Sequence, residues 1–237
     1  MWMHCTTYML NARFIGHCTA HLSTRSLACS LLLASLLLSA CSAPVRAVTD
    51  YVQFKRGGSQ ANVAKTPLTP GFDYLLITVN RKSFLMARGG TESSPDGAID
   101  IWYSGSREVM RLQNGRIIGS SGTPVEWTDV SLSAQPDWQQ IHGPIDIQRR
   151  RDVSPGYHFG LRDVLMVQPI AAPSSSAFYG RLPADLHWFS ETSSGPYPLP
   201  TSKYAVRFDG SRNEVIYGEQ CLSESLCFSW QRWPNRT

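Results

Sequence analysis

The feature that most constrains this chain is an apolar stretch at residues 27–41, LACSLLLASLLLSAC. It ends in the small residues Ser39 and Ala40, directly before Cys41. As an α-helix, the part before Cys41 is roughly 21 Å long at about 1.5 Å per residue, short of the ~30 Å hydrocarbon core of a bilayer. We therefore interpret residues 1–40 as a secretion signal peptide rather than a membrane anchor, so the fold has to be built from the residues that follow.

Residues 38–41, Leu-Ser-Ala-Cys, resemble a bacterial lipobox, at which a cysteine is lipidated and the chain is cut just before it. Small side chains before the cysteine fit a peptidase cleft, and the Cys41 thiol is the nucleophile that accepts the acylated glycerol. The leader carries Arg13 and Arg25 and no acidic residue, as targeting segments do. Lipidation of Cys41 is therefore predicted, the alternative being an ordinary signal peptide with an incidental cysteine.

Ser42, which follows the predicted lipidation site, is not the aspartate that commonly retains lipoproteins in the inner membrane. We therefore expect the protein on the periplasmic face of the outer membrane, with membrane lipid as its partner through acylated Cys41. The chain has 22 Lys and Arg against 18 Asp and Glu. Loss of Arg13 and Arg25 with the leader leaves a net charge of about +2, which is too small to suggest a nucleic-acid partner.

Cleavage before Cys41 would remove the cysteines of the leader and leave Cys221 and Cys227 as a pair in an oxidising compartment. We predict a disulfide between them, worth about 2 kcal/mol on the chain-entropy account. A metal site is the alternative. Since no histidine lies near this pair, no metal site is predicted.

Residues 42–69 contain Pro, Ala, Arg, Lys, Gly and Gln with little periodicity, and are predicted to be a lipidated N-terminus with a flexible tether, residues 41–69. From residue 70 to residue 237, short runs rich in Val, Ile, Tyr and Trp alternate with turn residues. Strands are predicted at residues 74–79, 83–88, 99–103, 108–112, 116–118, 145–148, 162–168, 184–189, 204–208 and 214–217.

The strand pattern predicts an all-β fold: an antiparallel meander forming a single sandwich or barrel-like domain with little helix. Asn114-Gly115 is the strongest hairpin signal, because both residues tolerate a positive φ. The one helical candidate is at residues 123–132. Residues 169–178 and 190–202, rich in Pro and Ser, are predicted surface loops.

Catalytic motifs are nearly absent. The serines of the glycine block at residues 119–122 do not have the spacing of a nucleophile elbow, and there is no P-loop, dinucleotide fingerprint or HExxH motif. His158 with Asp163, and His187 with Asp185, are sequence neighbours that we interpret as surface groups. We therefore expect a protein that is not an enzyme and has no cofactor.

A glycosidase needs two carboxyl groups that face each other across a cleft. The sequence offers candidates but does not show that any two converge: Asp96, Asp100, Glu126, Asp129 and Asp137.

Aromatic residues are the more suggestive feature, because flat rings stack on the apolar faces of sugars. Several tryptophans follow the leader, and each alone is more typical of a β core: Trp102, Trp127, Trp138, Trp188, Trp230 and Trp233. The run Arg149-Arg150-Arg151 could attract anionic polysaccharide or lipid headgroups, although a solvated strand end is the commoner explanation.

Two stretches resemble one family, the YjbF/GfcB-type capsule lipoproteins. Residues 107–124, REVMRLQNGRIIGSSGTP, look like its strand, Asn-Gly-Arg turn, strand and glycine block. Residues 203–222, KYAVRFDGSRNEVIYGEQCL, are similar to its closing hairpin, with a glutamine near the end of the second strand. The resemblance covers about residues 41–223, and the chain departs from the family in its long leader and in the segment from Cys221 onward.

This resemblance implies an all-β lipoprotein that helps assemble or export an exopolysaccharide or capsule, with polysaccharide and export-machinery proteins as partners. It transfers no catalytic residue. Contacts with glycan or partner are expected at an exposed face near Trp102 and Arg116, with Trp188 as a further candidate. The alternatives are a lipid-anchored glycan hydrolase and an envelope-assembly lipoprotein unrelated to polysaccharide.

Overall fold

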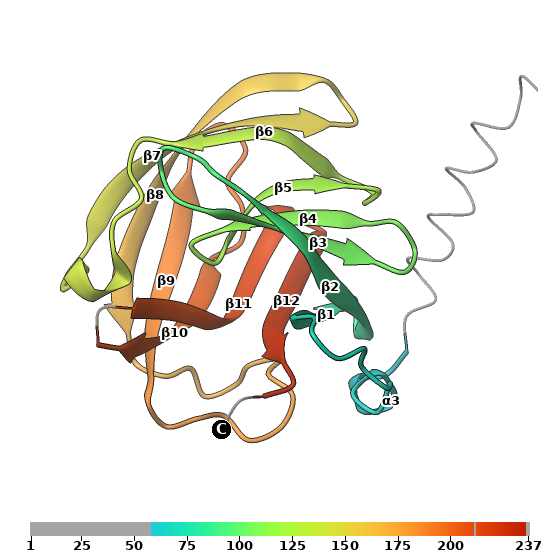
Figure 1. The fold of residues 1–237 in the computed structure, drawn as a ribbon. Helices are drawn as coiled ribbons and strands as arrows, with labels where there is room; N and C mark the ends of the chain where they lie inside the picture. Colours follow the sequence, from blue (N-terminus) through green and yellow to red (C-terminus); the bar gives the residue numbers. More distant parts are fainter. Residues whose placement is uncertain (1–57, 211, 236–237) are drawn as a thin grey trace, which may run out of the picture. The chain divides into compact units, whose positions relative to one another are not determined.

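The computed structural model describes residues 58–210 and 212–235 (Figure 1). These residues form one antiparallel sheet of 12 strands, one short helix, α3 (Gln60–Val63), and one 3-10 turn, η2 (Trp138–Gln140). The strands are β1 (Tyr74–Val79), β2 (Lys82–Glu92), β3 (Ile99–Ser104), β4 (Val109–Gln113), β5 (Arg116–Ser121), β6 (Glu126–Leu132), β7 (Ile145–Ser154), β8 (His158–Ile170), β9 (Leu186–Ser194), β10 (Ser202–Asp209), β11 (Arg212–Ser223) and β12 (Leu226–Trp233). The predicted all-β antiparallel meander is confirmed, whereas the predicted signal peptide and Cys41 lie outside the described residues.

The sheet is nearly closed into a barrel. Each strand pairs with the next one along the chain, except β5 with β6, and β12 returns to pair with β1 from Tyr74↔Trp233 to Val79↔Phe228. The two edge strands, β5 and β6, follow each other in sequence and lie next to each other in Figure 1. The Trp127 N–H donates to Ser120 Oγ across this seam at 3.0 Å, so side chains supply part of the pairing that the backbone does not.

Alternation along the strands builds the barrel interior. In β1, Leu75, Ile77 and Val79 face one large core cluster, while the residues between them point outward. Four tryptophans are among its fully buried side chains: Trp102, Trp127, Trp138 and Trp230. Register shifts occur in several strand pairs, and such bulges bend and twist a sheet, which helps it to close.

A second apolar cluster lies on the outer face, where the loop between β8 and β9 crosses β10 and β11. Trp188, Ala205 and Tyr217 are buried there, with Phe178 and Leu182 of the loop packed against them. The loop is held by hydrogen bonds, from Ala177 N–H to Tyr217 Oη at 2.8 Å and from Tyr179 N–H to Gln231 Oε1 at 2.7 Å. It is therefore a cover over the outer face of the sheet.

Several elements differ from the sequence predictions, among them the predicted loop at residues 169–178, whose first two residues belong to β8. The helix predicted at residues 123–132 is wrong, since residues 126–132 form β6, in which Trp127 is buried between less buried neighbours. Residues 190–194, predicted as loop, belong to β9, whose serines pair with β8 and β10 despite their low intrinsic strand preference. The strand β12 was not predicted, although four consecutive residues in its middle, at positions 228–231, are buried.

The described chain begins inside the segment predicted as a tether. The Ser83 N–H donates to the Gly58 carbonyl at 2.7 Å, and Gln60 Nε2 donates to Thr78 Oγ1 and to the Ala177 carbonyl, both at 2.9 Å. Ser59 caps α3 through its side chain. Residues 58–63 are thus bonded to β1, β2 and the covering loop.

The substitution Gly115→Ala should destabilise the protein for two reasons. Gly115 has φ +78°, and an added Cβ would overlap the side chain of Val215 on the opposite wall. We expect a loss of about 1–3 kcal/mol from backbone strain and a similar amount from overpacking, measured by urea unfolding. Gly97→Ala is the matched control, since Gly97 has φ +109° but open space around it. Equal losses for the two variants would contradict the packing against Val215.

Candidate functional site

The barrel interior contains a buried ion pair that crosses from one wall to the other. Arg116 Nε of β5 lies 2.7 Å from Glu191 Oε2 of β9, and both side chains are 2% exposed. The guanidinium carbon of Arg116 lies 4.2 Å from the ring centroid of Trp138 and 5.6 Å from that of Tyr204. Among the described residues, neither Nη atom of Arg116 has a hydrogen-bond partner. Arg116 is therefore an interior residue.

A second buried cluster explains the arginine run in β7. Because side chains alternate along a strand, Arg149 and Arg151 both point inward, where their Nε atoms lie 3.0 and 2.7 Å from Asp163 Oδ2. Both guanidinium groups lie over the ring of Trp127, at 4.9 and 5.4 Å. Arg150 points the other way and pairs with Asp129 at the surface. Two of the three arginines are thus unavailable to an anionic polymer or a lipid headgroup.

The expectation that Trp102 and Arg116 mark an exposed face is wrong, because both side chains point into the interior. Trp102 is fully buried, with the Arg232 guanidinium 5.4 Å from its ring. Trp188, the third predicted contact residue, is 3% exposed and lies under the loop between β8 and β9, edge-on to Tyr217.

Cys221 and Cys227 face each other across the β11–β12 hairpin and are joined by a disulfide, as the sequence indicated. Within the described part of the chain, no group of three or more His, Cys, Asp or Glu side chains is arranged to hold a metal ion.

The carboxylates considered for glycoside hydrolysis have separate partners on separate elements. Asp100 pairs with Arg88, Asp129 with Arg150, Glu126 accepts from Gly122 N–H, and Asp137 accepts from Gln139 N–H at the start of η2, while Asp96 lies in the turn before β3.

The two histidine–aspartate neighbours do not pair in the structure. Asp163 bonds to arginines and Asp185 bonds to Arg207, whereas His187 stacks on Phe208 with 4.2 Å between ring centroids.

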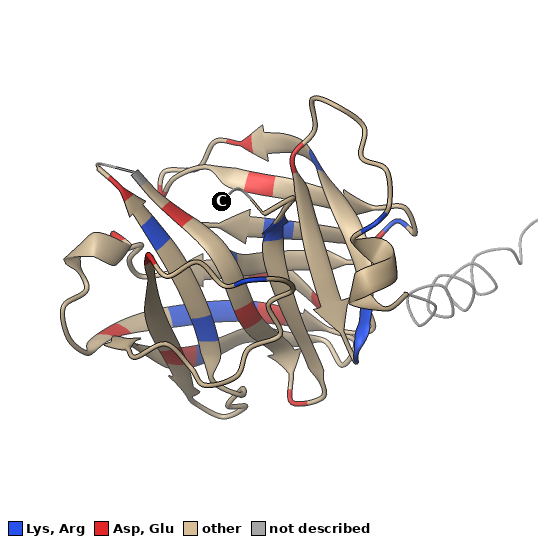
Figure 2. Ribbon diagram, turned by 90° about the horizontal axis from the view of Figure 1, so that it is seen from below, with Lys and Arg blue, Asp and Glu red and all other residues tan. Residues whose placement is uncertain are grey.

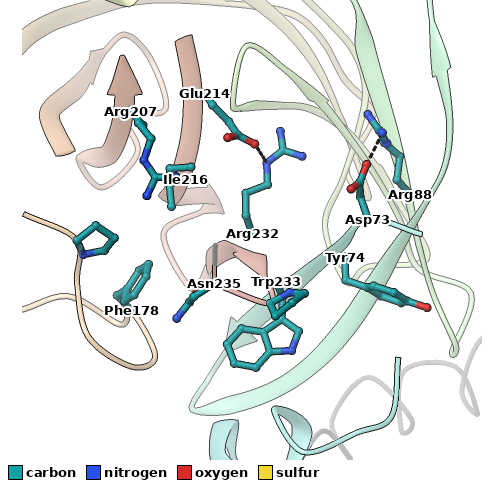
Figure 3. Close-up of a pocket in the computed structure, with 12 residues that line it drawn as sticks. Asp73, Tyr74, Arg88, Phe178, Arg207, Glu214, Ile216, Arg232, Trp233 and Asn235 are labelled. Atoms are coloured by element: carbon teal, nitrogen blue, oxygen red, sulfur yellow. Dashed lines mark hydrogen bonds and ion pairs between the residues drawn. The ribbon is translucent and has the colours of Figure 1, made fainter. Parts of the chain in front are cut away.

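A cavity of about 250 Å³ lies where the sheet opens at one end of the barrel (Figure 3). The pairing of β11 with β12 begins at Tyr217↔Gln231, so the first residues of β11 continue beside β10 and part from the end of β12. The walls come from this gap, from β1 and β2, and from the covering loop. We call it the rim cavity; six of the residues that line it are Asp73, Arg88, Phe178, Glu214, Arg232 and Trp233.

Charges in the wall of the rim cavity are arranged as pairs. Arg88 pairs with Asp73 and with Asp100, and Arg232 Nε lies 3.6 Å from Glu214 Oε1. Arg207, which also lines the cavity, lies 3.0 Å from Asp185. Figure 2 shows the same pattern more widely, with basic and acidic positions beside each other on the strands. The wall thus presents hydrogen-bond donors and acceptors together, and each of its arginines is paired with a carboxylate.

Aromatic rings complete the rim cavity. Tyr74, Phe178 and Trp233 are each partly exposed, and Figure 3 shows Trp233 and Phe178 on the same side of the cavity as Asn235. Trp233 was expected only as one aromatic residue among several, and the cavity itself was not predicted. Its residues run from position 73 to position 235 on five strands and a loop, so no local motif could have found it.

The fold and the rim cavity define a class, a single-sheet antiparallel β-barrel-like domain with a charged and aromatic cavity at one end. No family model matches the chain, and no curated protein matches it. Among solved structures it is similar to the crystal structure of the hypothetical lipoprotein YmcC from Escherichia coli (K12), with a TM-score of 0.54 and 12% identity over 78% of this chain and 93% of that one. At this identity the likeness shows the fold alone. No helix in the described residues is long and apolar enough to cross a membrane.

Replacing the buried carboxylate Asp163 should be severely destabilising. Asp163→Asn removes the negative charge between Arg149 and Arg151, whose side chains are 4% and 3% exposed. Leaving buried charges without their partner costs about 3–5 kcal/mol, which urea unfolding would measure. The control Asp129→Asn breaks the exposed pair with Arg150 and should cost less than about 1 kcal/mol. Similar losses in the two variants would contradict the role of Asp163.

The protein should lose stability in alkaline solution because of two tyrosines. Burial raises the pKa of Tyr204, with a further contribution from Glu191, and burial together with Glu219 raises the pKa of Tyr217. Unfolded tyrosine ionises near pH 10, so stability is unaffected by these groups below that pH and falls above it, by up to about 1.4 kcal/mol per pH unit for each.

Urea unfolding midpoints between pH 8 and pH 11 would measure this loss. Tyr217→Phe should reduce the alkaline slope, and an unchanged slope in that variant would contradict the assignment.

Proposed function

We propose that this chain is a lipid-anchored accessory protein in exopolysaccharide or capsule assembly or export, on the periplasmic face of the outer membrane, and that it acts without catalysing a reaction. Two observations, one from the sequence and one from the fold, together support the proposal. A lipobox-like sequence ends at Cys41, and the domain that follows shares its fold with a protein described as a hypothetical lipoprotein, over 93% of that protein's chain.

The two stretches that resemble capsule lipoproteins lie together in the fold, which supports the proposal. Residues 107–124 include β4 and β5, and residues 203–222 lie almost wholly in β10 and β11. Gln220 accepts from Ile117 N–H at 2.8 Å and donates to the Ile117 carbonyl at 2.9 Å, across the barrel interior. The glutamine noted near the end of the second stretch is therefore the residue that ties it to the first.

The proposed mechanism rests on anchoring. Each buried methylene of an acyl chain stabilises membrane binding by about 0.8 kcal/mol, so more than one chain makes the anchor durable. A domain held at the membrane meets polymer and partner proteins at a high effective concentration, so weak contacts suffice. The separate partners of the candidate carboxylates support a binding role over a hydrolytic one.

Deleting the gene in the bacterium that encodes it tests this function. We expect less polysaccharide at the cell surface, restored by the wild-type chain and by the leader variant Cys29→Ala, but not by Cys41→Ala, which cannot be acylated. Mass spectrometry should find acylated Cys41 as the mature N-terminus.

Two results would contradict the proposal. Unchanged polysaccharide after deletion would favour an envelope-assembly role unrelated to sugar. Shortening of the polymer by the purified protein would favour a hydrolase.

A further inference from the structure

We propose that the rim cavity is a binding site for a single neutral, hydroxyl-rich sugar residue of a polysaccharide. The inference rests on the proposed function, and names the ligand class and the residues that hold it. Three features of the cavity carry it: its size, the pairing of its charges and its aromatic rings.

The size of the rim cavity fits one sugar ring. At about 250 Å³ it is smaller than the roughly 300–1,000 Å³ of cavities that hold drug-sized ligands. Glu214 and Pro234 in its wall are exposed, so the cavity reaches the surface and a polymer can continue outward from the bound residue.

The charges of the rim cavity favour a neutral ligand. Each arginine of its wall faces a carboxylate: Arg88 faces Asp73, Arg207 faces Asp185, and Arg232 faces Glu214. Asp100 and Asp185 pair with these arginines from outside the lining, so no arginine of the wall is left with an unpaired positive charge to attract a uronate or a phosphate. The wall does offer guanidinium donors and carboxylate acceptors side by side, and a sugar hydroxyl both donates and accepts.

Arg232 is the residue best placed to turn toward a ligand. Its ion pairs with Glu214 and Asp100 measure 3.6 and 3.9 Å, which is longer than a hydrogen bond, and its Nε has no hydrogen-bond partner among the described residues. Its guanidinium lies over Trp102, which keeps the side chain near the cavity wall. The Nε is itself buried, but the side chain as a whole is 28% exposed, so a ligand hydroxyl can gain a charge-assisted bond from an Nη atom of Arg232.

The aromatic rings supply the apolar contact. Trp233 and Phe178 lie on one side of the rim cavity, opposite the pair formed by Arg232 and Glu214 (Figure 3). The face of an aromatic ring is electron-rich and attracts the C–H groups on the apolar side of a sugar. Trp233 is itself positioned by Tyr179 of the covering loop, with 5.8 Å between ring centroids.

Titration of the mature protein in detergent would test the site, with ligand-observed NMR as the readout. The probes are neutral tetrasaccharides (cellotetraose and maltotetraose), tetragalacturonate, and fragments of the bacterium's own polymer. We expect at least one neutral probe to bind, and tetragalacturonate to bind no more tightly. Trp233→Ala should weaken binding at least tenfold, and Glu214→Gln several-fold.

One variant serves as a negative control for binding, and another provides a second test of the site. Phe159→Ala removes a ring that is 70% exposed and does not line the cavity, and should leave binding unchanged. Glu214 is at the surface, so Glu214→Gln keeps the test decisive if Trp233→Ala does not fold.

The proposed site is overturned if no probe and no polymer fragment binds with dependence on Trp233 or Glu214, or if the uronate is preferred. If gene deletion lowers surface polysaccharide but no probe binds in the cavity, the binding site is rejected and the proposed function stands. If a sugar binds in the cavity but gene deletion leaves surface polysaccharide unchanged, the binding site stands and the proposed function is rejected.

Discussion

The structure depends on polar cross-links that hold opposite walls of the barrel together. The amide of Gln220 bonds to both backbone groups of Ile117 on β5, the strand at the open seam, and its oxygen also accepts from Tyr204 Oη at 3.0 Å. Buried backbone groups have to be paired, and here a side chain from the far wall provides the pairing. Within the sheet, β11 also carries a glycine at position 218, because a Cβ there would lie 2.7 Å from the ring of Trp230, its register partner on the neighbouring strand β12.

The same interior holds charges, which determines where a ligand can bind. Arg116 with Glu191, and Arg149 and Arg151 with Asp163, are buried, and such pairs are tolerated only when each partner stays in place. Tryptophan rings pack against these guanidinium groups in cation–π contacts, so side chains fill the middle of the barrel. A cavity forms instead at the end of the barrel, where β11 parts from β12 and the ion pairs are partly exposed to water.

Much of the fold could be predicted from local patterns, and the exceptions have physical causes. The β1 strand was predicted at residues 74–79 and is observed at Tyr74–Val79, because it is a short run of aromatic, aliphatic and β-branched residues free of Gly and Pro. The β6 and β9 strands were mistaken in part for helix and loop, because serines and acidic residues there gain strand structure from their neighbours. Trp102 was proposed as a surface contact, because a tryptophan in an alternating strand can lie on either face.

By itself, the sequence determined the lipobox-like motif that ends at Cys41 and the Asn114-Gly115 turn. The predicted strand ended at residue 148, and it is the observed β7, Ile145–Ser154, that places Arg149 and Arg151 on one face. Only the tertiary structure decided which face is the inside. Alternation groups the residues that share a face, but the closure of β12 on β1 turns one face inward and buries Trp102 with Arg116. The same closure brings Asp73 near Arg232, residues from opposite ends of the domain, to form a cavity that no local pattern encodes.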